Sequence, residues 1–121
     1  MDAILDTSVI IELFKGNRSV VERLRRDFVY GISAVTLFEL HCGTLKEREE
    51  IFFEKIPKLS YDENSAKLAG KIFRDLRKEG KMPKVKDLLI ASSAIASDKI
   101  LITRDSDFEI FRTFRLRVEF V

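Results

Sequence analysis

The 121-residue sequence has too few cysteines and histidines for the sites that those residues usually build. Its one cysteine, Cys42, excludes an internal disulfide and a cysteine-based zinc site. Its one histidine, His41, excludes a metal centre made of several histidines. Any metal here must therefore be held by oxygen ligands, which favours magnesium or manganese. We expect both His41 and Cys42 to be packing residues.

Long apolar runs are also missing from the sequence. No stretch approaches the ~20 apolar residues that span a bilayer, and the N-terminus lacks the basic segment of a signal peptide. We therefore expect a cytoplasmic protein without membrane contact. A net charge of +2 indicates no class of partner, so a nucleic-acid surface would have to come from local clusters of basic residues. The hydrophobic fraction of 45% and the chain length predict one domain over residues 1–121.

Short apolar runs alternate with segments of helical periodicity along the whole chain. The expected strands cover residues 3–5, 28–32, 58–61, 99–103 and 116–120. The expected helices cover residues 9–14, 18–27, 33–40, 45–55, 62–79, 85–97 and 108–111, with apolar positions that include Val35, Leu37, Phe38 and Leu40. This alternation predicts a three-layer α/β/α sandwich with a central, mainly parallel sheet of about five strands.

Four acidic residues occupy comparable places relative to the expected strands. Asp6 follows the first strand, and Asp105 lies two residues beyond the strand 99–103. Glu39 lies about two turns into the helix after the second strand, and Asp87 is near the start of a buried helix. In a parallel sheet all four side chains can reach one crevice at the carboxyl edge. A divalent cation would relieve their mutual repulsion and could stabilise a phosphodiester transition state.

Each of these acids also suits an ordinary role in a helix cap or a turn, as does Asp107. Glu39, for example, lies at capping-box spacing from Thr36. Two features favour a functional role instead. Glu39 interrupts an apolar face, and Asp87 is the only acid in residues 85–97. Charges in such settings usually have a partner.

Four segments together resemble a known family. They are Leu5–Ser8 (LDTS), Ser33–Leu40 (SAVTLFEL), Lys86–Ala94 (KDLLIASSA) and Ile102–Phe108 (ITRDSDF). In this order and spacing they resemble the PIN-domain nucleases, and most of all the VapC-type toxins of prokaryotic type II toxin–antitoxin pairs. The resemblance covers essentially the whole chain.

The resemblance implies a Mg²⁺- or Mn²⁺-dependent endoribonuclease that leaves 5′-phosphate and 3′-hydroxyl ends. Carried over to this sequence, Asp6 and Asp87 are the expected direct metal ligands. Glu39 and Asp105 are expected to complete the site, directly or through water. The last motif holds two aspartates, so Asp107 is the alternative to Asp105.

The resemblance also implies supporting residues and partners. Thr7, Ser8 or Thr103 would position a water molecule. Family members usually form homodimers, and a cognate antitoxin inserts its tail into a groove near the active site. Ile11 and Phe14 are candidates for the dimer interface, although both could equally belong to the core.

Basic residues that could bind RNA form several clusters. Lys81, Lys84 and Lys86 flank Asp87 and are the first candidates for contact with phosphate. Other basic residues share a helix face or a short segment: Lys67, Lys71, Arg74 and Lys78, and Arg23, Arg25 and Arg26. For the first of these two groups, a solvated helix face is at least as good an interpretation.

Three other functions compete with that of a toxin. A PIN protein of RNA processing would lack an antitoxin. A phosphoacceptor domain needs paired acids after its first strand and a lysine at a late strand end, whereas here Thr7 follows Asp6 and Arg104 follows Thr103. An inactive PIN scaffold would have no need to retain every expected acid.

Overall fold

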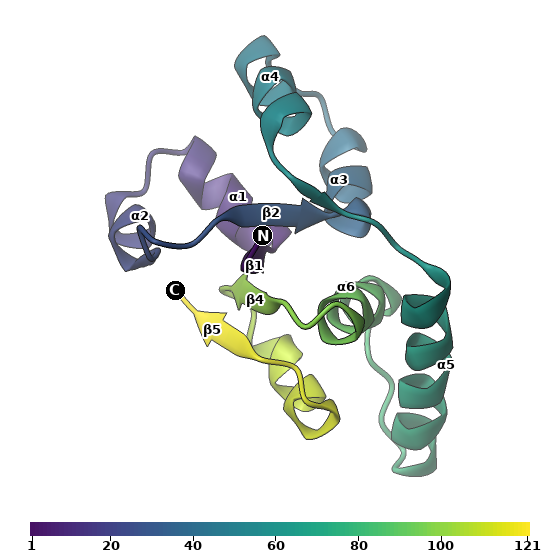
Figure 1. Ribbon diagram of the computed structural model, residues 1–121. Coiled ribbons are helices and arrows are strands. Elements are labelled where there is room, and N and C mark those ends of the chain that lie inside the picture. The colour runs from purple at the N-terminus through teal and green to yellow at the C-terminus, as the bar shows by residue number, and fades with distance from the viewer.

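A five-stranded sheet forms the centre of the computed structural model, which describes residues 1–121 (Figure 1). The strands are β1 (Ala3–Leu5), β2 (Tyr30–Ser33), β3 (Lys58–Leu59), β4 (Ile100–Thr103) and β5 (Val118–Phe120). Their order is β3-β2-β1-β4-β5, and every neighbouring pair is parallel. In the middle of the sheet, Ile4 lies opposite Gly31 on one side and Leu101 on the other. The predicted α/β class is confirmed, with an entirely parallel sheet.

Helices connect the strands and cover the sheet. They are α1 (Thr7–Phe14), α2 (Arg18–Arg23), α3 (Ala34–His41), α4 (Glu47–Lys55), α5 (Glu63–Lys78), α6 (Val85–Ala96) and the 3-10 helix η1 (Ser106–Phe114). Three of them begin at side chains suited to capping: Asn17, Ser33 and Asp62 each accept a hydrogen bond from the amide three residues later. No helix combines the length and the apolar character that crossing a bilayer demands.

The side chains of β1 show why the fold has three layers. Ile4 belongs to a core shared with α5, α6 and η1. Its neighbours Ala3 and Leu5 point to the opposite face, into a second core with α1, α2 and Phe53 of α4. Because successive side chains of a strand alternate between faces, this fully apolar strand requires helices on both sides. Figure 1 shows α5 and α6 grouped together, apart from α1 and α2.

Several element boundaries differ from those that the sequence predicted. α2 ends at Arg23 because Leu24 is extended, so the helix is shorter than 18–27. η1 is longer than the expected helix 108–111. Phe38 was expected to face the core but is 64% exposed. It lies two residues from the buried Thr36, which is about 200° around a helix.

The end of α3 also corrects the prediction for the two rare residues. Cys42 is exposed and is not a packing residue, because α3 ends at His41 and the chain turns toward solvent. His41 is exposed as well. Its ring lies 5.8 Å from that of Phe53, and its Nδ1 is 2.9 Å from the Leu37 carbonyl oxygen. His41 therefore contacts the surface of the core without being buried in it.

The strand order also determines where a ligand site can form. From β1 the sheet continues through β2 in one direction and through β4 in the other. In open parallel sheets, a crevice forms at the carboxyl ends of the two strands where the order reverses. Here these strands are β1 and β4, and they are followed directly by Asp6 and by Arg104-Asp105.

Two glycines provide a matched test of this packing. A Cβ atom at Gly31 in β2 would lie 2.7 Å from the Pro57 carbonyl oxygen and 2.8 Å from the Met1 sulfur. Gly31→Ala should therefore lower the free energy of unfolding by about 1–3 kcal/mol. At Gly70 in α5 the nearest atom would be 3.6 Å away, so Gly70→Ala should raise it by roughly 0.5–1 kcal/mol. Urea unfolding of both variants measures these changes, and equal effects would contradict the close approach at β2.

Candidate active site

Asp6 lies at the centre of the crevice between β1 and β4. Asp6 is only 6% exposed, and its Oδ2 atom accepts hydrogen bonds from Ser8 Oγ at 2.9 Å and Thr103 Oγ1 at 2.8 Å. Asp6 stands at the N-cap position of α1, but its side chain makes no capping hydrogen bond. The helix-cap interpretation therefore does not explain this aspartate.

The two hydroxyl groups that hold Asp6 are themselves fixed by the backbone beyond β4. Ser8 Oγ accepts a hydrogen bond from the Arg104 amide at 3.1 Å. Thr103 Oγ1 accepts one from the Asp105 amide at 3.0 Å. Each hydroxyl thus donates a hydrogen bond to the Asp6 carboxylate and accepts one from a backbone amide that follows β4. This network fixes the position of Asp6 relative to the segment that carries Asp105.

Glu39 projects from α3 on the other side of Asp6. Its carboxylate accepts a hydrogen bond from Thr7 Oγ1 at 3.3 Å and forms an ion pair with Lys86 Nζ at 3.0 Å. Capping of α3 is done by Ser33, whose Oγ accepts the Thr36 amide at 3.0 Å. The structure thus excludes the capping box between Thr36 and Glu39. Glu39 is free of a structural cap, and its charge contributes to the raised pKa of Asp6.

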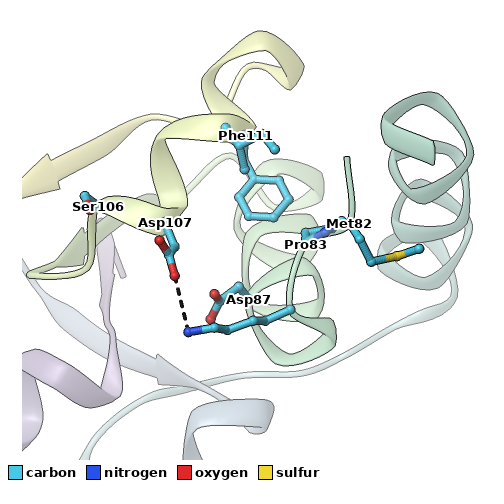
Figure 2. Close-up of a pocket in the computed structure, with 8 residues that line it drawn as sticks. Met82, Pro83, Asp87, Ser106, Asp107 and Phe111 are labelled. Atoms are coloured by element: carbon cyan, nitrogen blue, oxygen red, sulfur yellow. Dashed lines mark ion pairs between the residues drawn. The ribbon is translucent and has the colours of Figure 1, made fainter. Parts of the chain in front are cut away.

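Asp87, Asp105 and Asp107 form the tightest group of acids. Each offers one carboxylate oxygen, and the three oxygens lie within 4.8 Å of one another. Figure 2 shows Asp87 on α6 and Asp107 on η1 facing each other across a pocket of about 360 Å³. Asp105 Oδ1 also accepts the Asp107 amide at 2.9 Å, which caps the start of η1. The turn role expected of Asp105 is therefore present together with its place in the cluster.

The environment of these acids disfavours their ionised forms. Burial raises the pKa of Asp6 above its usual value, although the hydrogen bonds from Thr103 and Ser8 oppose this effect. Burial and, next, the charges of Asp105 and Asp6 raise the pKa of Asp87 to about 6. A group of carboxylates that repel one another, with only oxygen donors, matches the coordination chemistry of a hard divalent cation. The residues present therefore fit such an ion.

Two lysines from the start of α6 reach the acids from opposite sides. Lys84 Nζ lies 3.3 Å from Asp107 Oδ2, and Lys86 pairs with Glu39. These ion pairs, with smaller contributions from Asp87, raise the pKa of both lysines. Lys81 instead pairs with Glu79 at 3.5 Å, outside the acidic cluster.

The sequence singled out Lys84 and Lys86 but did not show that they pair with the acids. Lys84 is the extended residue before α6, whereas Lys86 lies in the first turn of the helix. No sequence pattern shows which acid each of the two lysines reaches. Elsewhere, Lys67 pairs with Glu63 and Lys71 with Asp75 on α5, as on a solvated helix face.

A family model described as the PIN domain matches residues 3–112. The chain belongs to the PIN-domain family. The match covers all four motifs, from Leu5-Asp6 to Asp107-Phe108, so the resemblance noted in the sequence is confirmed.

Relatives within this PIN-domain family carry VapC names. Ribonuclease VapC3 of Methanocaldococcus jannaschii is 54% identical over 92 residues, which are 76% of this chain and 97% of the relative. Ribonuclease VapC1 of the same organism is 32% identical over 120 residues, covering 95% of this chain and 85% of the relative. A chain of the DNA-bound VapBC structure from Salmonella typhimurium superposes with a TM-score of 0.82 at 26% identity, covering 99% and 98% of the two chains.

The raised pKa of Asp87 predicts a pH dependence of stability in the absence of divalent ions. The folded pKa of about 6 exceeds the unfolded value of about 3.8, so the folded state binds more protons between these values. Stability should therefore fall as pH rises from 4 to 6.5. Asp87→Asn removes this penalty and should stabilise the protein at pH 7, by on the order of 1 kcal/mol after solvent screening, and not at pH 4.

Urea unfolding in EDTA at the two pH values measures this effect. The shift for Asp6 has the same direction, so it adds to the slope of the wild type and remains in the Asp87→Asn variant. If Asp87→Asn changed the stability equally at pH 4 and pH 7, the pKa of Asp87 would not be raised in the folded protein.

Proposed function

We propose that this PIN-domain protein is a divalent-cation-dependent endoribonuclease, and that it is the toxin of a toxin–antitoxin pair. One observation carries the proposal: Asp6, Asp87 and Asp105, from three distant parts of the chain, meet at the crevice where the strand order reverses. Relatives named Ribonuclease VapC support the reaction class. The proposed unit of activity is the whole of residues 1–121.

The proposed metal ligands are the acids of this crevice. Asp6 and Asp87 are direct ligands in the proposal, and Glu39 and Asp105 complete the site directly or through water. Asp107 belongs to the same tight group as Asp105 and remains the alternative to it. A Mg²⁺ or Mn²⁺ ion, when bound, would supply charge compensation at the phosphodiester and activation of water for hydrolysis.

The surrounding residues of the chain orient these acids. Ser8 and Thr103 hold one oxygen of Asp6, and Thr7 holds one oxygen of Glu39. Because these hydroxyls are fixed before substrate binds, little reorganisation is needed in the reaction. In the proposed in-line hydrolysis, the products carry 5′-phosphate and 3′-hydroxyl ends.

The RNA backbone is proposed to bind along the start of α6. Lys84 and Lys86 are exposed and line the crevice, and Lys81 lies on the loop that leads to it. Lysines contact phosphates without regard to base sequence, so they explain affinity and not target choice.

The antitoxin tail is proposed to occupy a groove near the active site. A groove of about 420 Å³ adjoins Glu39 there, lined by residues of α1, α3 and the segment that follows, among them Thr7, Leu40 and Leu45. The VapBC complexes among the structural relatives support an antitoxin as the occupant. For the proposed homodimer, Ile11 is 42% exposed and remains a candidate contact. Phe14 instead packs edge-on against Phe52 and Phe53, so it serves mainly the core.

The nuclease assignment predicts the following result. Purified protein should cleave a mixed-sequence RNA in Mg²⁺ or Mn²⁺ and not in EDTA. Asp6→Asn and Asp87→Asn should each lower the rate at least about 100-fold, equivalent to ~2.7 kcal/mol of transition-state stabilisation. Gel analysis of labelled RNA measures the rate, and circular dichroism confirms that the variants are folded.

A control on α5 separates the site from general surface charge. Lys67→Met removes an exposed lysine that pairs with Glu63, and it should leave the rate within about 2-fold of wild type. Failure of the folded wild type to cut RNA in either metal would favour an inactive PIN scaffold. Cleavage that survives in both aspartate variants would show that the site is misplaced.

A further inference from the structure

The ion pair between Lys84 and Asp107 lies in the lining of the pocket that Asp87 also borders. Lys84 precedes α6 and Asp107 lies in the first turn of η1, so the pair connects two elements that are distant in sequence. Both side chains are largely exposed, at 69% and 54%. Figure 2 shows the pair as a dashed line beside Asp87. Exposed pairs of this kind contribute little to stability, so fold stabilisation does not explain it.

A divalent cation held by the three aspartates would compete with Lys84 for Asp107. Asp107 offers one oxygen to the group that Asp87 and Asp105 complete. An ion among these three oxygens would neutralise Asp107 and repel the Lys84 ammonium, which is also attracted to Asp87 and Asp105. The flexible lysine side chain can leave without any movement of the backbone.

We propose that Lys84 is a phosphate-binding residue which Asp107 sequesters in the cation-free protein and which cation binding releases to the RNA backbone. This inference rests on the proposed nuclease function and extends it. Metal loading then acts twice, because it completes the site and frees a positive charge beside it. RNA bound before the cation lacks this contact.

Lys86 provides a contrast within the same turn of α6. Its partner Glu39 is only 15% exposed at the side chain and is also held by Thr7. Glu39 is not a member of the three-aspartate group. Where Glu39 completes the proposed metal site through water, its pair with Lys86 stays in place, so the release proposed here concerns Lys84.

A double-mutant cycle tests the sequestration without any cation. The dissociation constant of a labelled single-stranded RNA is measured by fluorescence anisotropy in EDTA, where no cleavage occurs. Lys84→Met should change it less than about 2-fold in the wild type but weaken binding about 5-fold in the Asp107→Asn background. Equal effects of Lys84→Met in the two backgrounds would overturn the proposal.

A matched cycle controls for the general effect of removing an acid. Lys67→Met and Glu63→Gln break an exposed pair of 2.9 Å on α5, away from the pocket. The effect of Lys67→Met on RNA affinity should be the same, within about 2-fold, with and without Glu63→Gln. A coupling as large as that of Lys84 with Asp107 would show that any surface pair behaves this way, and it would overturn the specific role.

Cation affinity gives a second readout that needs no RNA. Isothermal titration calorimetry should show that Mn²⁺ binds about 3- to 10-fold more tightly to Lys84→Met than to wild type, because the competing Lys84 ammonium is gone. Lys67→Met should bind Mn²⁺ as wild type does. Unchanged affinity in Lys84→Met would refute the competition.

The two proposals fail in different ways. If no variant binds RNA at low salt, with or without Ca²⁺, the proposed function fails and Lys84 has no substrate to bind. If RNA binds but the cycle is additive, the nuclease assignment stands and only the release of Lys84 is refuted.

Discussion

The hydrogen bonds of the Asp6 carboxylate hold together the part of the sheet where the acidic residues meet. Ser8 comes from α1 and Thr103 from the end of β4, and both donate to the same oxygen of Asp6. Burying the Asp6 carboxylate without these donors would lower the free energy of unfolding. Without the carboxylate, the two hydroxyls would lose the acceptor that they share. The network therefore stabilises the contact between β1 and β4 and orients the acids around it.

Much of this arrangement follows from local sequence. The apolar run before Asp6 predicts a buried strand, and the carboxyl ends of parallel strands must share an edge. The convergence of Asp6, Asp87 and Asp105 could therefore be predicted without coordinates. The helix starts at Ser33 and Asp62 could also be predicted from the sequence, because their side chains accept hydrogen bonds from amides in the first turn.

Other features depend on tertiary geometry that no local pattern contains. Phe38 is exposed because the opposite side of α3 faces the sheet. The hydrophobic pattern of the helix does not show which side that is. Likewise, the partners of Lys84 and Lys86 depend on how α6 is rotated against η1 and α3. The sequence identified these lysines as basic, but their assignment to Asp107 and Glu39 requires the packed structure.

The strand order also has a consequence for the nascent chain. β1 precedes the other four strands in the sequence but lies at the middle of the sheet, and its second neighbour β4 begins only at Ile100. A ribosome-bound product that ends before Ile100 has Asp6 but lacks Thr103 and Asp105. The acids can therefore assemble only after Thr103 and Asp105 have been synthesised, and a product interrupted earlier carries Asp6 and Asp87 without the residues that complete the crevice.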